Sequence, residues 1–329
     1  MKAIQTLLIR CCAAAVLLFA GVAQAQGYPN KPITLIVPFA PGGFVHAVAL
    51  MISESMSSIL GQPVVVLNQP GANGMVAATA VARAAPDGYT IFLPTASILT
   101  INPHLYKNVQ YDPLNDFVPV GVIVNTTNMF VVNAQSGIKS FKDLVERARS
   151  KPEAVSYGSS GNGSIQHIAG EVLQQQARVK LVHVPYKGIG PALIDVAGGN
   201  LTVVFGDASS LPHVKSGKLT AIAVSPRPID ELPGVPALSD AVAAAGLPNY
   251  TAPTLWYGLV APKGTPHAIA ARLSDALAQS LRRPAVRDKL LAAGALPAEN
   301  ASGEYFGRTI RADYDRYGSM LKTLNITVE

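Results

Sequence analysis

The chain has 329 residues, of which 49% are hydrophobic and only 14% are charged. This length is typical of about two domains, and the apolar fraction excludes an intrinsically disordered chain. The formal charge of +6 is spread thinly, without a run of Lys and Arg. A nucleic-acid-binding function, which needs a concentrated basic patch, is therefore unsupported.

The N-terminal segment has the pattern of a secretory signal peptide. Lys2 and Arg10 precede an apolar run over residues 11–23, and Ala23-Gln24-Ala25 follows as a small-residue cleavage site. We expect a signal peptide over residues 1–25, cleavage after Ala25 and a periplasmic protein. An uncleaved anchor is the alternative, although the run is shorter than the ~20 residues that span a bilayer. Both cysteines, Cys11 and Cys12, would leave with this segment, so we expect no disulfide and no thiolate metal site.

Strand and helix patterns alternate through the first third of the chain. Short apolar runs predict strands over residues 33–39, 64–67 and 89–93. Apolar residues spaced by three and four predict a helix from Val45 to Ile59, ended by Gly61, and a second helix is expected over 77–85. This alternation predicts an α/β fold with a doubly wound sheet.

The same alternation starts again near residue 129. We expect strands over 129–132, 156–157, 181–184, 201–205, 219–224 and 256–260, and helices over 140–150, 165–176, 192–197, 266–281 and 302–324. The Pro-rich stretch 226–236 is expected to be a connection. The restart predicts two lobes, the first from 26–125 plus 225–329 and the second from 126–224.

Motifs for catalysis and for metal binding are missing from the sequence. Residues 158–162 fail the G-x-S-x-G pattern at their last position, no P-loop is present, and the six histidines are dispersed. We therefore expect no catalytic residue and no metal site. One enzymatic alternative stays open, an exported hydrolase or transferase that uses Ser160 and His167.

Two glycine-rich turns stand between a predicted strand and a predicted helix. The first is Pro38-Phe39-Ala40-Pro41-Gly42-Gly43, and the second spans residues 157–164, Tyr-Gly-Ser-Ser-Gly-Asn-Gly-Ser. Open α/β sheets place ligands beyond the carboxyl ends of their strands, and the free N–H groups at a helix start favour an anion. One such turn in each half predicts a two-sided clamp for a ligand with one or two carboxylates. The alternative is that each is simply a turn, with Ser164 as a helix cap.

Several short stretches, in one order along nearly the whole mature chain, resemble the substrate-binding proteins of tripartite tricarboxylate transporters, the Bug-type receptors. The matching stretches are residues 28–33, 37–43, 70–74, 85–89, 102–103, 111–113, 116–117, 157–164, 183–188, 212–213, 216–219 and 256–262. The resemblance implies a two-lobe fold like the type II periplasmic binding proteins, hinged and closing on a small organic acid. It implies no cofactor and no chemistry, delivery of the ligand to a membrane permease, and a monomer.

The resemblance also implies which residues bind the ligand. In the first lobe these are Phe39, Ala40, Pro41, Gly42, Gly43, Phe44 and Val45, and in the second lobe Ser159, Ser160, Asn162, Gly163, Ser164, His167 and Asp207. This chain departs from the family pattern at Val45, at His46 (usually Asp), and at Gly206-Asp207 (often Asp-Asn). Phe44 and Val45 either favour an aromatic or longer aliphatic acid or pack under the loop. Asp207 either receives a ligand ammonium or hydroxyl group or is a solvated loop residue, and the role of His46 stays open.

Overall fold

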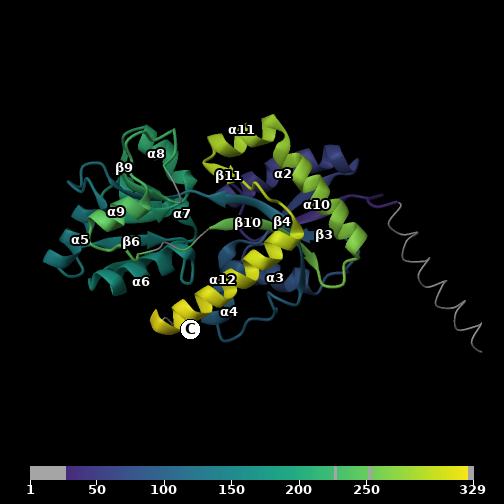
Figure 1. The fold of residues 1–329 in the computed structure, drawn as a ribbon, viewed down its shortest axis with the longest axis horizontal. Helices are drawn as coiled ribbons and strands as arrows, with labels where there is room; N and C mark the ends of the chain where they lie inside the picture. The colour runs from purple at the N-terminus through teal and green to yellow at the C-terminus, as the bar shows by residue number, and fades with distance from the viewer. Residues whose placement is uncertain (1–26, 226–227, 251–252, 254, 325–329) are drawn as a thin grey trace, which may run out of the picture.

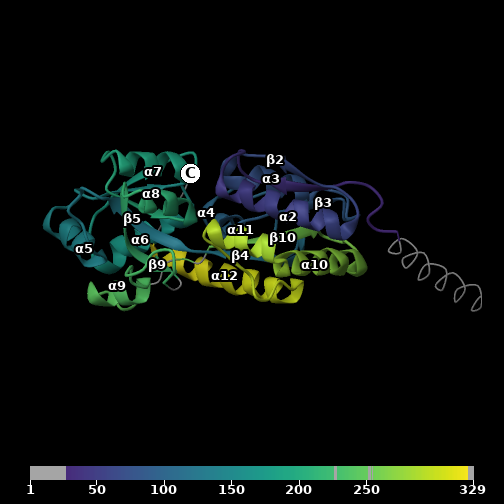
Figure 2. The same ribbon diagram turned by 90° about the horizontal axis from the view of Figure 1, so that it is seen from above.

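The computed structural model describes residues 27–225, 228–250, 253 and 255–324. The expected signal peptide and residues 226–227 of the Pro-rich connection lie outside the described residues. Two lobes lie side by side, each built on a central sheet with helices on both of its faces (Figures 1 and 2). The two-lobe α/β architecture predicted from the sequence is confirmed.

The sheet of the first lobe has six strands in the order β11-β4-β10-β3-β1-β2. They are β1 (Ile33–Val37), β2 (Val64–Asn68), β3 (Thr90–Phe92), β4 (Phe117–Thr126), β10 (Trp256–Pro262) and β11 (Ala295–Pro297). The first three strands are parallel, whereas β10 runs antiparallel to both β3 and β4. The parallel strands therefore bring their carboxyl ends to one edge of the sheet, where the first turn begins.

Helices cover both faces of this sheet. One group consists of α2 (Phe44–Leu60), α10 (His267–Arg282) and α11 (Pro284–Ala292), which contact one another. On the opposite face (Figure 1) lie α3 (Met75–Ala82), the short elements η1 (Ala72–Gly74), η2 (Ser97–Ile101) and α4 (Asn102–Leu105), and α12 (Gly303–Leu324). The apolar positions predicted for the first helix, from Val45 through Ile52 to Met56, are its buried face.

The sheet of the second lobe has five strands in the order β7-β6-β8-β5-β9. They are β5 (Asn128–Asn133), β6 (Ser156–Ser159), β7 (Val182–Pro185), β8 (Val203–Gly206) and β9 (Leu219–Ser225). Side chains alternate along β5, so Phe130 and Val132 pack toward one face and Met129 and Val131 toward the other. The helices are α5 (Phe141–Ser150), α6 (Ile165–Ala177) and α9 (Leu238–Ala244), with α7 (Ile189–Ala197), η3 (Ala208–Ser210) and α8 (Leu211–Lys215).

The chain passes between the lobes at two places. Only Thr127 separates the end of β4 in the first sheet from the start of β5 in the second. The return lies between β9 and β10, and α9 within it still packs against α5 and β9. This return segment therefore stays beside the second sheet well beyond residue 225. Within the described part of the chain, no helix has the length and apolarity needed to cross a membrane.

Candidate ligand-binding site

The first glycine-rich turn connects β1 to α2 and faces open space. Gly42 has a φ of +87°, a conformation that favours glycine, and residues 40–43 are exposed. No atom lies within 4 Å of the point where a β-carbon on Gly42 would stand. Gly43 caps α2 without a side-chain hydrogen bond, and the first turn of that helix contains no acidic residue. The positive end of the helix dipole is thus left uncompensated, which favours an anion.

The second turn connects β6 to α6 in the other lobe. Gly161 (φ +133°) and Gly163 (φ +74°) supply the backbone conformations that the turn requires. The Ser164 hydroxyl accepts a hydrogen bond from the N–H of His167 at 3.4 Å, so it caps the helix as the alternative interpretation supposed. The first turn of α6 also lacks an acidic residue. Both turns therefore end at helix starts of the same electrostatic kind.

The serine side chains of the second turn form hydrogen bonds within the second lobe. The hydroxyl of Ser159, a fully buried residue, lies 2.7 Å from His183 Nε2, and Ser160 Oγ donates to Gln166 Oε1 at 2.9 Å. The N–H of Gly163 donates to His167 Nδ1 at 3.1 Å. The pair that the hydrolase alternative needs, Ser160 with His167, is therefore not formed, because each side chain has another partner. These groups hold the shape of the turn.

Two stacked histidines lie beneath the second turn. The rings of His167 and His183 have centroids 4.2 Å apart and an interplanar angle of 13°, and His183 also stacks on Tyr157. Burial lowers the pKa of both imidazoles, and the neighbouring His167 adds to the effect at His183, whose pKa falls to about 4. Both rings are therefore neutral at physiological pH. The sequence did not single out His183, because its contacts lie far away along the chain.

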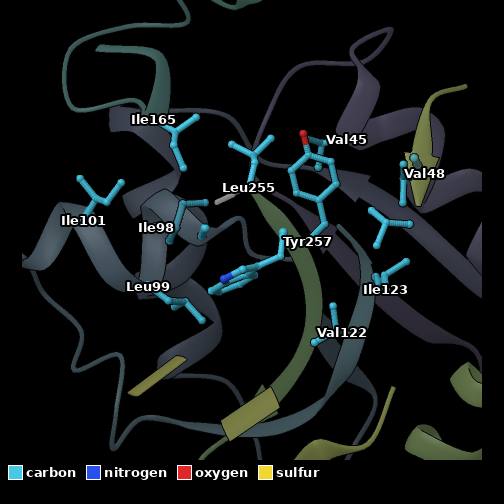
Figure 3. Packing of buried hydrophobic residues seen from close by; sticks show 14 of the residues in the cluster. Val45, Val48, Ile98, Leu99, Ile101, Val122, Ile123, Ile165, Leu255 and Tyr257 are labelled. Atoms are coloured by element: carbon cyan, nitrogen blue, oxygen red, sulfur yellow. The ribbon is translucent and has the colours of Figure 1, made fainter. Parts of the chain in front are cut away.

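The starts of α2 and α6 converge on strand β10. Figure 3 shows Val45 and Ile165, one from each helix start, on either side of Leu255 and Tyr257. The Tyr257 side chain points toward the start of α2, and its ring centroid lies 5.8 Å from that of Phe44. The structure therefore places the apolar end of the first turn and the start of the second lobe's α6 around one tyrosine that the sequence did not single out.

The lobes also touch directly. The Tyr106 hydroxyl, in the first lobe, donates to the carbonyl oxygen of Asn162 in the second turn at 3.0 Å. A β-carbon on Gly163 would stand 3.2 Å from the side chain of Leu105. On another part of the junction, a β-carbon on Gly294 would lie 2.4 Å from that of Ala208. The second turn is thus held against the first lobe, and glycine is needed where the two lobes come closest.

Asp207 follows β8 at this junction and is only 6% exposed. Its Oδ1 accepts hydrogen bonds from the N–H and the hydroxyl of Ser209. Burial raises the pKa of its carboxyl, and the charge of Asp207 helps to raise the pKa of the buried Tyr257 phenol. Asp207 is therefore a buried residue and not a solvated loop residue.

His46 stands in the first turn of α2. His46 Nδ1 is fully enclosed and has no hydrogen-bond partner in the described structure. Among the described residues, no three His, Cys, Asp or Glu side chains are grouped so that they could hold a metal ion.

Comparison with known proteins identifies the family. Residues 48–326 match the family described as tripartite tricarboxylate transporter family receptor. Protein BugT of Bordetella pertussis is 34% identical over 287 residues, which cover 84% of this chain and 86% of BugT. The solved structure of R. palustris Rpa4515 with adipate has a TM-score of 0.84 and 32% identity, over 91% of this chain and 99% of that one. MatC from Rhodopseudomonas palustris with bound malate has a TM-score of 0.81 and 28% identity, over 89% and 100%.

Proposed function

Because the chain belongs to the tripartite tricarboxylate transporter receptor family, we propose that it is a solute-binding receptor for a small carboxylate-bearing metabolite. The observation that carries this proposal is the pair of helix starts, each without an acidic first-turn residue, that flank Tyr257 from opposite lobes. Such N-termini bind anions through free backbone N–H groups. Adipate and malate, found in two similar structures, are both small dicarboxylates.

The ligand is bound between the lobes and favours the arrangement in which both turns contact it. In the first lobe we assign the contacts to the backbone of residues 39–43 and to the side chains of Phe44 and Val45. In the second lobe Ser160, Asn162, Gly163, Ser164 and Asp207 lie at or beside the ligand. Ser159 and His167 act from beneath the turn, because Ser159 is fully buried against His183 and the His167 ring is stacked on that same histidine. Binding alone needs no cofactor.

The cellular setting follows from the same proposal. Residues 1–25 direct export of the receptor and are then cleaved off. The mature receptor works in the periplasm as a monomer. It presents its ligand to the permease subunits of a tripartite tricarboxylate-type transporter. The chain crosses from the first lobe to the second at residues 126–127. It returns shortly before β10, since α9 still packs on the second sheet. This division moves the second boundary from residue 225 to beyond residue 250, because the Tyr250 hydroxyl donates to the carbonyl oxygen of Ala169 in α6.

A panel of thermal-shift measurements tests the proposed function. It contains di- and tricarboxylates, aromatic acids, amino acids and neutral sugars. A specific ligand present at 100 times its Kd adds about 2.7 kcal/mol to the free energy of unfolding. We expect such a shift from one class of acid, without consumption of the compound by NMR. A shift from sugars alone, or turnover of a bound acid, would contradict the receptor assignment.

Tyr106→Phe is expected to weaken binding without touching the ligand. The substitution removes the hydroxyl that joins the first lobe to the Asn162 carbonyl. A neutral hydrogen bond contributes about 1 kcal/mol, so the affinity should fall about five-fold. Calorimetric titration with the acid found in the panel measures this. The matched control is Tyr305→Phe, an exposed tyrosine on α12 that should leave the affinity unchanged. Equal affinities for all three proteins would show that this contact does not contribute to the bound arrangement.

A further inference from the structure

A cavity of about 270 Å³ lies in the first lobe, between α12 and the segment that leads into β4. Its apolar wall consists of Leu114, Phe117, Pro119 and Ile310. Phe117 and Ile310 are only 7% and 3% exposed, so the inner side of the cavity is apolar. The Asp112 carboxylate accepts a hydrogen bond from the N–H of Leu114 at 2.9 Å, which fixes the segment on this side. The volume is near the lower end of the range for small-molecule sites, ~300–1,000 Å³.

The cavity is remote from the proposed carboxylate site. Because β10 runs antiparallel to both β3 and β4, β4 runs in the same direction as β1, β2 and β3. Phe117, at the start of β4, therefore lies at the edge of the sheet opposite to the one where the first glycine-rich turn begins. With a rise of ~3.3 Å per residue, the ten residues of β4 place the lobe junction about 30 Å away. A ligand in this cavity therefore does not compete for space with one between the lobes.

Gly307 lines the cavity from within α12, although packing does not require a glycine there. A β-carbon at this position would lie 3.4 Å from Pro119 Cγ and 4.0 Å from Pro119 Cβ, which are ordinary van der Waals distances. The backbone of Gly307 is not left-handed, and glycine within a helix is less favourable than alanine. A longer side chain at this position would occupy the cavity. The glycine therefore keeps the space open although it makes the helix less stable.

Two guanidinium groups stand beside the apolar wall. Arg308 and Arg311 both line the cavity, and both are exposed. Arg308 forms an ion pair with Glu304, one turn earlier in α12. The side chain of Arg311 forms no ion pair or hydrogen bond with any other residue that the structure describes. One unpaired positive group is thus left next to an apolar recess.

We propose that this cavity is a second ligand-binding site, which takes a small aromatic monocarboxylate. The ring lies beside Gly307 against Phe117 and Ile310, and the carboxylate pairs with the Arg311 guanidinium. A guanidinium group binds a carboxylate through two parallel N–H···O hydrogen bonds, and an aromatic ring packs well against another ring. Neither part of this recognition depends on the glycine-rich turns, so the site binds independently of the proposed receptor function.

An acidic, aromatic segment of a partner protein would meet the same chemistry. A stable protein interface, however, buries ~800 Å² on each partner and needs apolar side chains around its centre. Among the described side chains of α12, only Tyr305 is a large hydrophobic residue with substantial exposure. The cavity is therefore a confined recess in a mostly polar helix surface, which favours a small molecule.

Calorimetric titration with benzoate tests the site, with benzamide and acetate as matched probes. Benzamide keeps the ring without the charge, and acetate keeps the charge without the ring. We expect benzoate to bind with a Kd of about 1 mM or below, and each of the other two at least about ten-fold more weakly. Gly307→Leu fills the cavity with a residue that suits a helix better than glycine, so it should remove one equivalent of bound benzoate per chain. Arg311→Gln should weaken binding at the same site about ten-fold.

Two control variants make the same kinds of change elsewhere. Gly190→Leu places a leucine at an exposed glycine of α7, and Arg287→Gln removes an exposed charge of α11. Both should leave benzoate binding unchanged. If Gly307→Leu fails to fold, Arg311→Gln replaces it, because that position is exposed. The acid identified by the thermal-shift panel should bind all variants equally between the lobes, so failure of the receptor function and failure of the cavity site give different results.

Three results would overturn the site. They are no binding of benzoate, a stoichiometry and affinity that survive both Gly307→Leu and Arg311→Gln, and binding of benzamide as tightly as benzoate. The second result would place benzoate between the lobes. Binding of an acidic peptide with one phenylalanine, in the absence of benzoate binding, would also overturn the small-molecule site and assign the cavity to a protein partner.

Discussion

Gly121→Ala is expected to lower the free energy of unfolding by about 3 kcal/mol, the upper part of the range for overpacked cores. The new methyl group would lie 2.0 Å from the carbonyl oxygen of Ala301 and 3.0 Å from Leu277 Cδ2. The oxygen belongs to the backbone and therefore has no rotamer by which to move away. β4 is also held on both sides, by β10 and by β11.

The segment before α12 has equally little freedom. The N–H of Ala298 donates to the carbonyl oxygen of Ile123 at 3.0 Å, which fixes this segment on β4. A β-carbon on Gly303 would lie 2.4 Å from the carbonyl oxygen of Pro119, so the close approach continues into the start of α12. Relief of the clash must therefore displace α12 or bend β4. Because β4 leads directly into the second lobe, either movement would also disturb the lobe junction.

Urea unfolding measures this effect as a fall in the transition midpoint. The matched control is Gly190→Ala in α7, where no atom lies within 4 Å of the added methyl and the backbone is not left-handed. Glycine within a helix costs roughly 0.5–1 kcal/mol relative to alanine, so the control should be neutral or stabilising. Equal stability of Gly121→Ala and the unmodified protein would mean that residues 298–303 do not lie against β4.

The same glycine explains why β4 was absent from the elements expected from the sequence. Pro119 and Gly121 both argue against a strand when only local pattern is considered. The strand forms because the segment before α12 lies on it, and irregularities in its pairing with β10 accommodate these residues. The helices and strands that were expected from the sequence lie within a few residues of their predicted bounds, since their signal lies in local periodicity, whereas α9, α11 and β11 were not predicted.

The candidate site was predictable in its backbone and less so in its side chains. Glycine-rich turns after strands identify both helix starts from the sequence alone. Ser159 pairs with His183, and the charge of Asp207 acts on the pKa of Tyr257, although the members of each pair are distant in the chain. Such pairings depend on tertiary packing, so a local motif does not contain them. His183 and Tyr257 stand in stretches that match the family, but the match does not say what they touch.

The histidine stack beneath the second turn should make the protein less stable in mild acid. Burial and the neighbouring His167 lower the pKa of His183 from 6.5 to about 4. Between these values the unfolded chain takes up a proton that the folded protein does not bind. The free energy of unfolding therefore falls as the pH decreases from about 6.5 toward 4, and it is constant above that window with respect to this group. His167, whose pKa is also lowered, acts in the same direction.

Two other titratable groups modify the pH dependence of the unmodified protein. Glu171 lies 3.8 Å from His167 Nε2 and favours its protonated form, which opposes the effect of burial. Asp207 has a raised pKa, so its contribution has the opposite sign and stabilises the folded state as the pH falls. The pH dependence of the unmodified protein is therefore a sum of opposing contributions. Only its difference from a variant without the titrating ring isolates His183.

His183→Phe is the variant that isolates this contribution, because it keeps an aromatic ring against Tyr157 and His167 but does not titrate. Part of the His183 ring is open to solvent, so we expect the unmodified protein to lose about 1–2 kcal/mol more than the variant between about pH 7.5 and pH 5. Urea unfolding at the two pH values measures the difference in slope. Loss of the Ser159 contact lowers the stability of the variant at both values and leaves that slope unaffected. Parallel pH dependences for the two proteins would show that His183 is protonated in the folded state as readily as in the unfolded chain, and that the second turn is not held by neutral histidines.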